Sequence, residues 1–98
     1  MEEERLYIVT YDIADDRRWR SVFRLMKGYG EWVQLSVFQC RLGRARHAEF
    51  VARLSELLNQ REDHVMIMDL GSAARVEPRV QSIGKRTFEP VERVPIIV

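Results

Sequence analysis

The chain has 98 residues, 46% of them hydrophobic and 32% charged, and its formal net charge is +1. This length allows one domain with a core but not two, and the composition excludes a disordered tail. No apolar run approaches the roughly 20 residues that cross a bilayer. The acidic segment at residues 1–5 lacks a secretory signal, and the single Cys40 cannot form an internal disulfide. We therefore expect a cytoplasmic protein that does not contact a membrane.

The basic residues are concentrated in two groups. The first has no acidic residue within it and comprises Arg17, Arg18, Arg20, Arg24 and Lys27; the second comprises Arg41, Arg44 and Arg46. The planar donors of arginine match phosphate oxygens, so this segregation indicates a nucleic-acid partner. Arginine is also an ordinary residue on exposed helix surfaces, and the sequence pattern does not separate the two interpretations.

The first predicted element is a strand over residues 6–12, rich in β-branched and aromatic residues, that ends at Asp12. A carboxylate at a strand tip can hold a metal ion or a proton at low ordering cost, because rigid backbone meets solvent there. Asp12 could instead accept backbone N–H groups in a turn.

Asp15 or Asp16 is predicted to cap a helix that ends at residues 28–30. Its expected buried stripe is Trp19, Val22, Phe23 and Met26. Residues 32–40 are predicted to form one strand. Its two faces carry Val33, Leu35 and Val37 on one side and Gln34, Ser36, Phe38 and Cys40 on the other.

A second helix is predicted from about residue 45 to 59, followed by a strand over residues 64–70 and a short strand over 79–83. The expected apolar stripe of this helix is Phe50, Val51, Leu54, Leu57 and Leu58. His47 begins the helix and His64 begins the strand, but neither has metal-ligand spacing. We assign the two histidines no role.

The predicted fold class is an α+β, ferredoxin-like βαββαβ sandwich, in which two helices cover one face of an antiparallel sheet. The domain would span residues 1–98. Nothing in so short a chain remains to cover the other face except a second copy, so we expect a homodimer packed through its sheets. The apolar C-terminal segment, at about residues 86–98, is expected to add an edge strand to the partner protomer.

Several motifs then resemble the CRISPR-associated protein 2 family, which is the small subunit of the spacer-acquisition machinery. The resemblance spans roughly residues 5–98 and rests on Tyr11-Asp12-Ile13, Asp15-Asp16, Arg17-Arg18, the turn at Gly30 and Gln34-Leu35-Ser36-Val37-Phe38. It implies a homodimeric CRISPR adaptation protein that acts with the CRISPR integrase subunit on prespacer DNA. It also implies metal-dependent endonuclease activity on single-stranded RNA or double-stranded DNA.

The resemblance also implies roles for individual residues. Asp12 would be the catalytic residue and the Mg²⁺ ligand, contributed once by each protomer near the two-fold axis. The nucleic-acid-binding residues would be Tyr11, Arg17, Arg18, Arg20, Ser36 and Phe38, with Tyr11, Ser36 and Phe38 lining the cleft. Trp32 departs from the family, which often has a basic residue there, so base stacking or plain packing replaces a phosphate contact.

Two other functions compete with the nuclease. The sequence offers one carboxylate position and no evident general base, which is little machinery for phosphodiester hydrolysis. The alternative is therefore a non-catalytic DNA-binding adaptor dimer. A regulatory module for a small ligand lacks any convincing pocket motif. Two copies of Asp12 across a dimer axis would give Mg²⁺ the carboxylates it requires, and the metal site therefore depends on the dimer.

Overall fold

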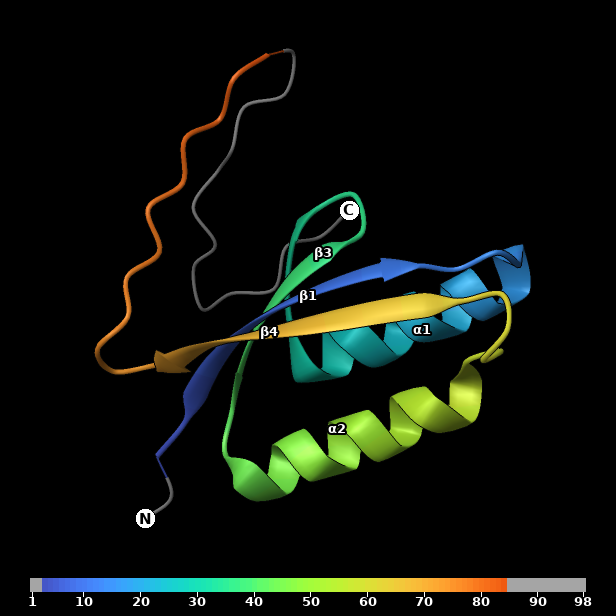
Figure 1. The fold of residues 1–98 in the computed structure, drawn as a ribbon, viewed down its shortest axis with the longest axis horizontal. Helices are drawn as coiled ribbons and strands as arrows, with labels where there is room; N and C mark the ends of the chain where they lie inside the picture. The colour runs from blue at the N-terminus through green and yellow to red at the C-terminus, as the bar shows by residue number, and fades with distance from the viewer. Residues whose placement is uncertain (1–2, 85–98) are drawn as a thin grey trace.

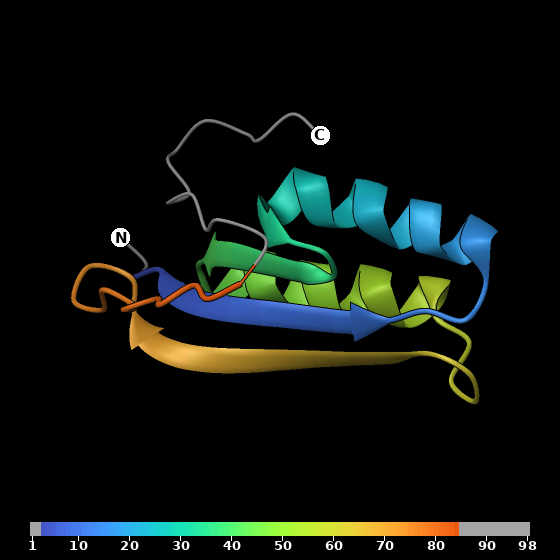
Figure 2. The same ribbon diagram turned by 90° about the horizontal axis from the view of Figure 1, so that it is seen from above.

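The computed structural model describes residues 3–84 and places four strands and two helices in the predicted βαββαβ order. The elements are β1 (Arg5–Asp12), α1 (Asp16–Tyr29), β2 (Gly30–Gln34), β3 (Val37–Leu42), α2 (Arg44–Leu57) and β4 (His64–Ser72). The sheet order is β2-β3-β1-β4, and every neighbouring pair is antiparallel. Both helices cover the same face of the sheet (Figures 1 and 2). The ferredoxin-like α+β prediction is confirmed.

The core lies between the helices and the face of the sheet that they cover. Alternate residues of β1, namely Tyr7, Val9 and Tyr11, are at most 6% exposed and point toward the helices. They meet buried side chains from the other elements: Val22, Met26, Phe38, Cys40, Phe50 and Leu54. The predicted stripe of the first helix is confirmed, with Trp19 and Phe23 partly buried against this core. In the second helix Val51 is 38% exposed, so its assignment to the stripe was wrong.

The prediction of one strand over residues 32–40 is wrong, because a hairpin turn at Leu35 and Ser36 separates β2 from β3. Leu35 adopts a φ of +38°, and its carbonyl accepts a 2.9 Å hydrogen bond from the Trp32 indole nitrogen. Tight hairpin turns usually carry Gly, Asn or Asp at such positions. None is present here, so the sequence contains no signal for the turn. The Trp32 ring packs partly buried against the core.

The ends of the other elements differ little from expectation. Asp15 is the N-cap of α1 and accepts the Arg18 backbone N–H at 2.9 Å, as predicted. The helix continues through Gly28 and ends at Tyr29. Its C-cap is Gly30, where a Cβ would collide with the Cys40 sulfur and the Gln39 carbonyl. Glycine is therefore required where β2 approaches β3.

Residues 79–83, which were predicted to be a short strand, form no strand. The segment predicted to pack on a partner, about 86–98, lies outside the described residues.

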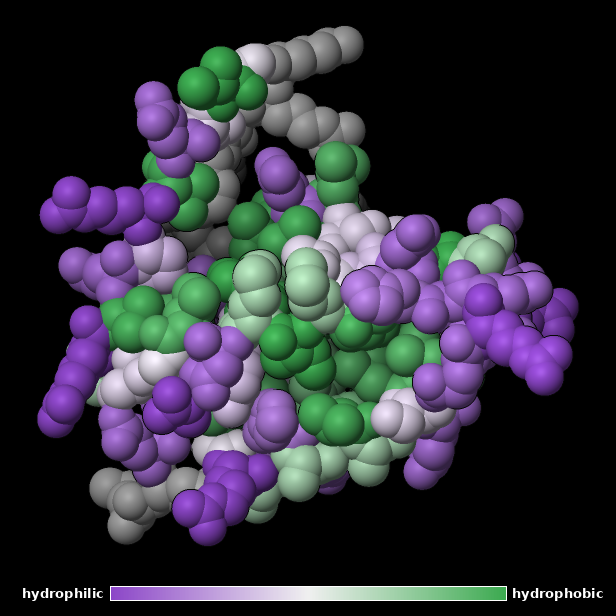
Figure 3. Space-filling view, viewed as in Figure 1, coloured by the Kyte–Doolittle hydropathy of each residue, from purple (hydrophilic) through white to green (hydrophobic). Residues whose placement is uncertain are grey.

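The second face of the sheet, which we call the open face, is covered by neither α1 nor α2 (Figures 1 and 2). Met66 and Met68 on β4 are 46% and 39% exposed on this face, beside Ile8 and Thr10 of β1. Figure 3 shows hydrophobic side chains gathered near the middle of the molecule and hydrophilic ones around them. Near the β2–β3 hairpin, the extended segment at residues 78–83 and the open face enclose a groove of about 620 Å³.

Candidate metal and nucleic-acid site

Asp12 is the last residue of β1, and its side chain is exposed at one end of the open face. Because Tyr11 points toward the helices, the alternation along the strand directs Asp12 to the opposite side. Its carboxylate accepts no hydrogen bond and forms no ion pair with any residue between 3 and 84. The alternative in which Asp12 binds backbone N–H groups in a turn is thus not observed. Asp12 is free to bind a ligand.

A second aspartate, Asp63, lies at the same end of the sheet and has the opposite character. Its side chain is fully buried, and it accepts hydrogen bonds from the backbone nitrogens of Ala14 and Asn59 at 2.9 and 2.8 Å. The Arg18 guanidinium forms an ion pair with it at 2.8 Å. These donors, the Arg18 guanidinium above all, lower the pKa of Asp63 to about 2. Asp63 therefore fixes the loop that follows Asp12 to the loop that precedes β4.

Arg18 belongs to this internal network and not to a free cationic surface. Besides Asp63, it pairs with Glu62 at 2.9 Å, and only 27% of its side chain is exposed. Both carboxylates hold the pKa of Arg18 above its ordinary value. The predicted phosphate contact would require Arg18 to leave these partners, so its observed role is structural.

Three of the other cations of α1 are available. Arg17, Arg20 and Arg24 are exposed and form no ion pair with any described residue. Their spacing of three and four residues places them on one side of the helix. The second predicted basic group is mostly engaged: Arg41 donates to the Ala73 carbonyl at 3.3 Å, and Arg46 donates to the Gly28 carbonyl at 3.0 Å.

Tyr11, Ser36 and Phe38 lie close together, but the two rings are buried inside the protein instead of lining a cleft. Phe38 has no exposed surface, and its ring centroid lies 6.2 Å from that of Tyr11. Burial raises the pKa of Tyr11 to about 12, against a small opposing effect of the Ser36 side chain. The Tyr11 hydroxyl has no hydrogen-bond partner in the described part of the chain. Tyr11 and Phe38 are thus core rings that support the strand end, while Ser36 is partly exposed in the hairpin.

His64, to which the sequence assigned no role, lies directly beside Asp12. It is the first residue of β4, and its register partner on β1 is Asp12. His64 is also exposed and forms no ion pair or hydrogen bond with another described residue. No sequence spacing could reveal this pair, because the two residues are 52 positions apart and only the β1–β4 register unites them.

The site of one protomer is small. Across residues 3–84, no three His, Cys, Asp or Glu side chains gather in a way that could hold a metal ion. Asp12 and His64 together supply one oxygen and one nitrogen donor group. A metal bound here would need further ligands from water, nucleic acid or a second copy of the chain.

Comparisons with known proteins agree with the motifs. The family model described as CRISPR associated protein Cas2 matches residues 5–77. The chain is 56% identical to the CRISPR-associated endoribonuclease Cas2 of Geobacter sulfurreducens, across 97% of this chain and 99% of that protein. The chain belongs to the Cas2 family. A second Cas2 relative, named CRISPR-associated endoribonuclease Cas2 1, from Rhodospirillum rubrum, is 52% identical across 97% of this chain and 92% of its own.

The solved structures give the same fold for this Cas2 chain. A crystal structure titled cas2 superposes with a TM-score of 0.70 at 30% identity and covers 93% of this chain and 98% of that one. The family resemblance drawn from the Asp12 and Gln34–Phe38 motifs is therefore confirmed. Separately, no helix among the described residues is both long and apolar enough to cross a membrane.

Proposed function

We propose that this Cas2 chain is a CRISPR adaptation protein that acts with the CRISPR integrase and cleaves nucleic acid as a metal-dependent endonuclease. The observation that carries the proposal is the free Asp12 carboxylate at a rigid strand end. The relatives' names supply the reaction class, an endoribonuclease. The substrate classes follow from the family resemblance: single-stranded RNA or double-stranded DNA.

The proposed site lies between two protomers that pair through their open faces. Met66 and Met68 leave apolar surface exposed on this face, and burying such surface contributes about 25 cal/mol per Å². A two-fold axis would bring one Asp12 from each copy to the same cleft. Two carboxylates and several waters form a ligand set that Mg²⁺ accepts. When bound, the ion would supply an activated water and neutralise charge on the phosphoryl oxygens.

The residues of α1 would bind the substrate backbone. Arg17 and Arg20 are exposed and unpaired among the described residues, as is Arg24 one turn farther along. Guanidinium groups bind phosphate oxygens in bidentate geometry, and this requires no base-specific contact. The structure thus supports Arg17 and Arg20 for this role, and Arg24 extends the same side of the helix.

The test is cleavage by the purified full chain and by Asp12→Asn, each assayed with Mg²⁺ and with a chelator. We expect Asp12→Asn to cleave RNA or DNA at least about 100-fold more slowly, because loss of the metal ligand removes several kcal/mol of transition-state stabilisation. The control is Asp16→Asn, which changes an exposed aspartate in the first turn of α1 and should retain cleavage.

Two results would contradict the nuclease proposal. Cleavage that survives in Asp12→Asn would belong to another site or to a contaminant. If the wild-type chain shows no cleavage but supports spacer acquisition equally well with Asn at position 12, the chain is a non-catalytic adaptor dimer.

A further inference from the structure

The pairing of Asp12 with His64 has a consequence for the kind of metal that the site selects. We propose that Asp12 and His64 of one protomer chelate a single divalent transition-metal ion, so that the site prefers such an ion to Mg²⁺. This inference rests on the proposed function, because it takes Asp12 as the metal ligand. It adds a second ligand and a metal class.

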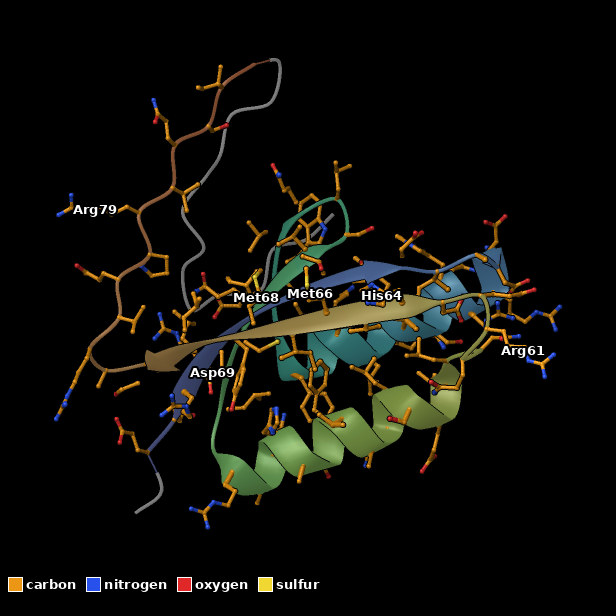
Figure 4. The ribbon with its side chains drawn as sticks, viewed as in Figure 1. Arg61, His64, Met66, Met68, Asp69 and Arg79 are labelled. Atoms are coloured by element: carbon orange, nitrogen blue, oxygen red, sulfur yellow. The ribbon has the colours of Figure 1, made fainter. Side chains whose placement is uncertain are left out.

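The strand register places the two side chains next to each other on the same face of the sheet. Directly opposed residues of antiparallel strands project to the same face, with Cβ atoms about 4.5–5.5 Å apart. A carboxylate oxygen and an imidazole nitrogen each bind a metal at about 2.0–2.2 Å, so their donor atoms must lie roughly 3 Å apart. Side chains that start from opposed Cβ atoms reach this separation by ordinary rotamer changes. Figure 4 shows His64 at the start of β4, in line with Met66 and Met68.

The backbone on both sides of the pair is fixed by Asp63. This buried carboxylate immediately precedes His64, and it binds the Ala14 nitrogen two residues after Asp12. Together with the Arg18 ion pair, these contacts hold the end of β1 and the start of β4 together. Ligands carried by a rigid backbone lose less entropy when they bind a metal. The side chains of Asp12 and His64 form no competing hydrogen bond or ion pair with another described residue.

The chemistry of the donors sets the preference. Mg²⁺ binds oxygen ligands and keeps several waters. Imidazole nitrogen favours first-row transition ions, whose affinities rise from Mn²⁺ through Co²⁺ to Ni²⁺. A mixed carboxylate and imidazole pair therefore favours these ions over Mg²⁺ more strongly than a pair of Asp12 carboxylates alone does.

The experiment measures metal binding by the full chain without nucleic acid. Co²⁺ is the probe, because its visible absorption responds to the atoms that coordinate it, and Mg²⁺ is tested as a competitor. We expect His64→Gln to weaken Co²⁺ binding about tenfold or more while Mg²⁺ binding changes less than about twofold. The control is His47→Gln, which removes the only other histidine of the chain and should bind Co²⁺ as the wild type does.

A second variant tests the preference itself. His64→Asp converts the nitrogen donor to oxygen, so the ratio of Co²⁺ to Mg²⁺ affinity should fall about tenfold or more. Both substitutions are at an exposed strand-initial position, and circular dichroism will check that each variant folds. Equal Co²⁺ affinity and spectrum in the wild type and His64→Gln would overturn the inference.

The outcomes separate this inference from the proposed function. If Asp12→Asn abolishes metal binding and His64→Gln does not, the inference fails while Asp12 remains the proposed ligand. If neither substitution alters metal binding, the metal site at this end of the sheet is contradicted altogether.

Discussion

The two faces of the sheet differ most at the end where Asp12 and Asp63 lie. On the helix-covered side, Asp63 is buried and bound by Arg18 and two backbone nitrogens. On the open face, Asp12 and His64 are exposed and form no hydrogen bond or ion pair with another described residue. The same end of the sheet thus carries one carboxylate that the fold satisfies and one that it leaves without a partner among the described residues.

This difference distinguishes charges that are bound within the fold from charges that remain available to a ligand. A buried carboxylate needs partners because desolvation of an unpaired charge is costly. An exposed carboxylate needs none for stability, and its position on a braced strand end makes it available to a ligand. The comparison also separates the arginines of α1: Arg18 is held by Asp63 and Glu62, whereas Arg17 and Arg20 are free of ion pairs with the described residues.

The largest effect on stability is expected for Asp63→Asn, which leaves the Arg18 guanidinium without its buried partner. The pKa of Asp63 is about 2 in the folded state, against about 3.9 for an ordinary aspartate. Because the folded-state pKa is depressed, the ionised carboxylate stabilises the protein fully above about pH 4, and this stabilisation is lost as the pH falls toward 2. Urea unfolding at several pH values measures the effect.

At pH 7 the wild type should therefore have a higher free energy of unfolding than Asp63→Asn. Between pH 5 and pH 2, the free energy of unfolding should fall more for the wild type than for the variant. The matched control is Glu62→Gln, which removes the other carboxylate on Arg18, one that is 57% exposed. Its effect should stay within about 1 kcal/mol, as for other exposed pairs. If Asp63→Asn and Glu62→Gln lower the free energy of unfolding equally, the burial of Asp63 does not strengthen its ion pair with Arg18.

A smaller effect, on binding alone, is expected for Arg20→Glu. Each phosphate contact contributes about 0.9 to the slope of log affinity against log salt concentration on duplex DNA. Loss of one contact should reduce the slope by about 1, without a change in the urea midpoint. Fluorescence anisotropy with labelled DNA over a range of salt concentrations provides the measurement.

Arg44→Glu is the control for this variant, because it makes the same change in net charge at an exposed position at the start of α2. It should leave the slope unchanged. If the two variants weaken DNA binding equally, the cationic side of α1 has no special role and only the overall charge matters.

The sequence predicts the helices, the first strand and the Asp15 cap because each depends on local periodicity or on a local hydrogen bond. It does not predict the hairpin at Leu35, where a turn forms at a positive φ without a turn residue. It also misses the partners of Arg18 and of Asp12. Asp63 is brought to Arg18 by the connection between α2 and β4, and His64 is brought to Asp12 by the register of β1 and β4. The two residues of each pair are far apart in the sequence, so no short sequence window contains both.

For the candidate site, the sequence thus predicts the position of Asp12 but not the burial of its neighbouring rings. The motif around Asp12 marks the strand end, and the family resemblance is the source of the metal chemistry that we propose there. Burial of Tyr11 and Phe38 could not be read from the motif, because an alternating strand is equally compatible with either face toward the core. The structure sets that direction and assigns the two rings to the core.

Pairing of two chains through the open face is the central claim, and sedimentation equilibrium with the wild type and Met66→Glu tests it most directly. A charge at this exposed strand position should be tolerated in a single protomer but not between two copies. We predict a wild-type mass of twice 11.6 kDa and a folded variant that sediments as one chain. A wild type that remains a single 11.6 kDa species at working concentration would contradict the shared cleft.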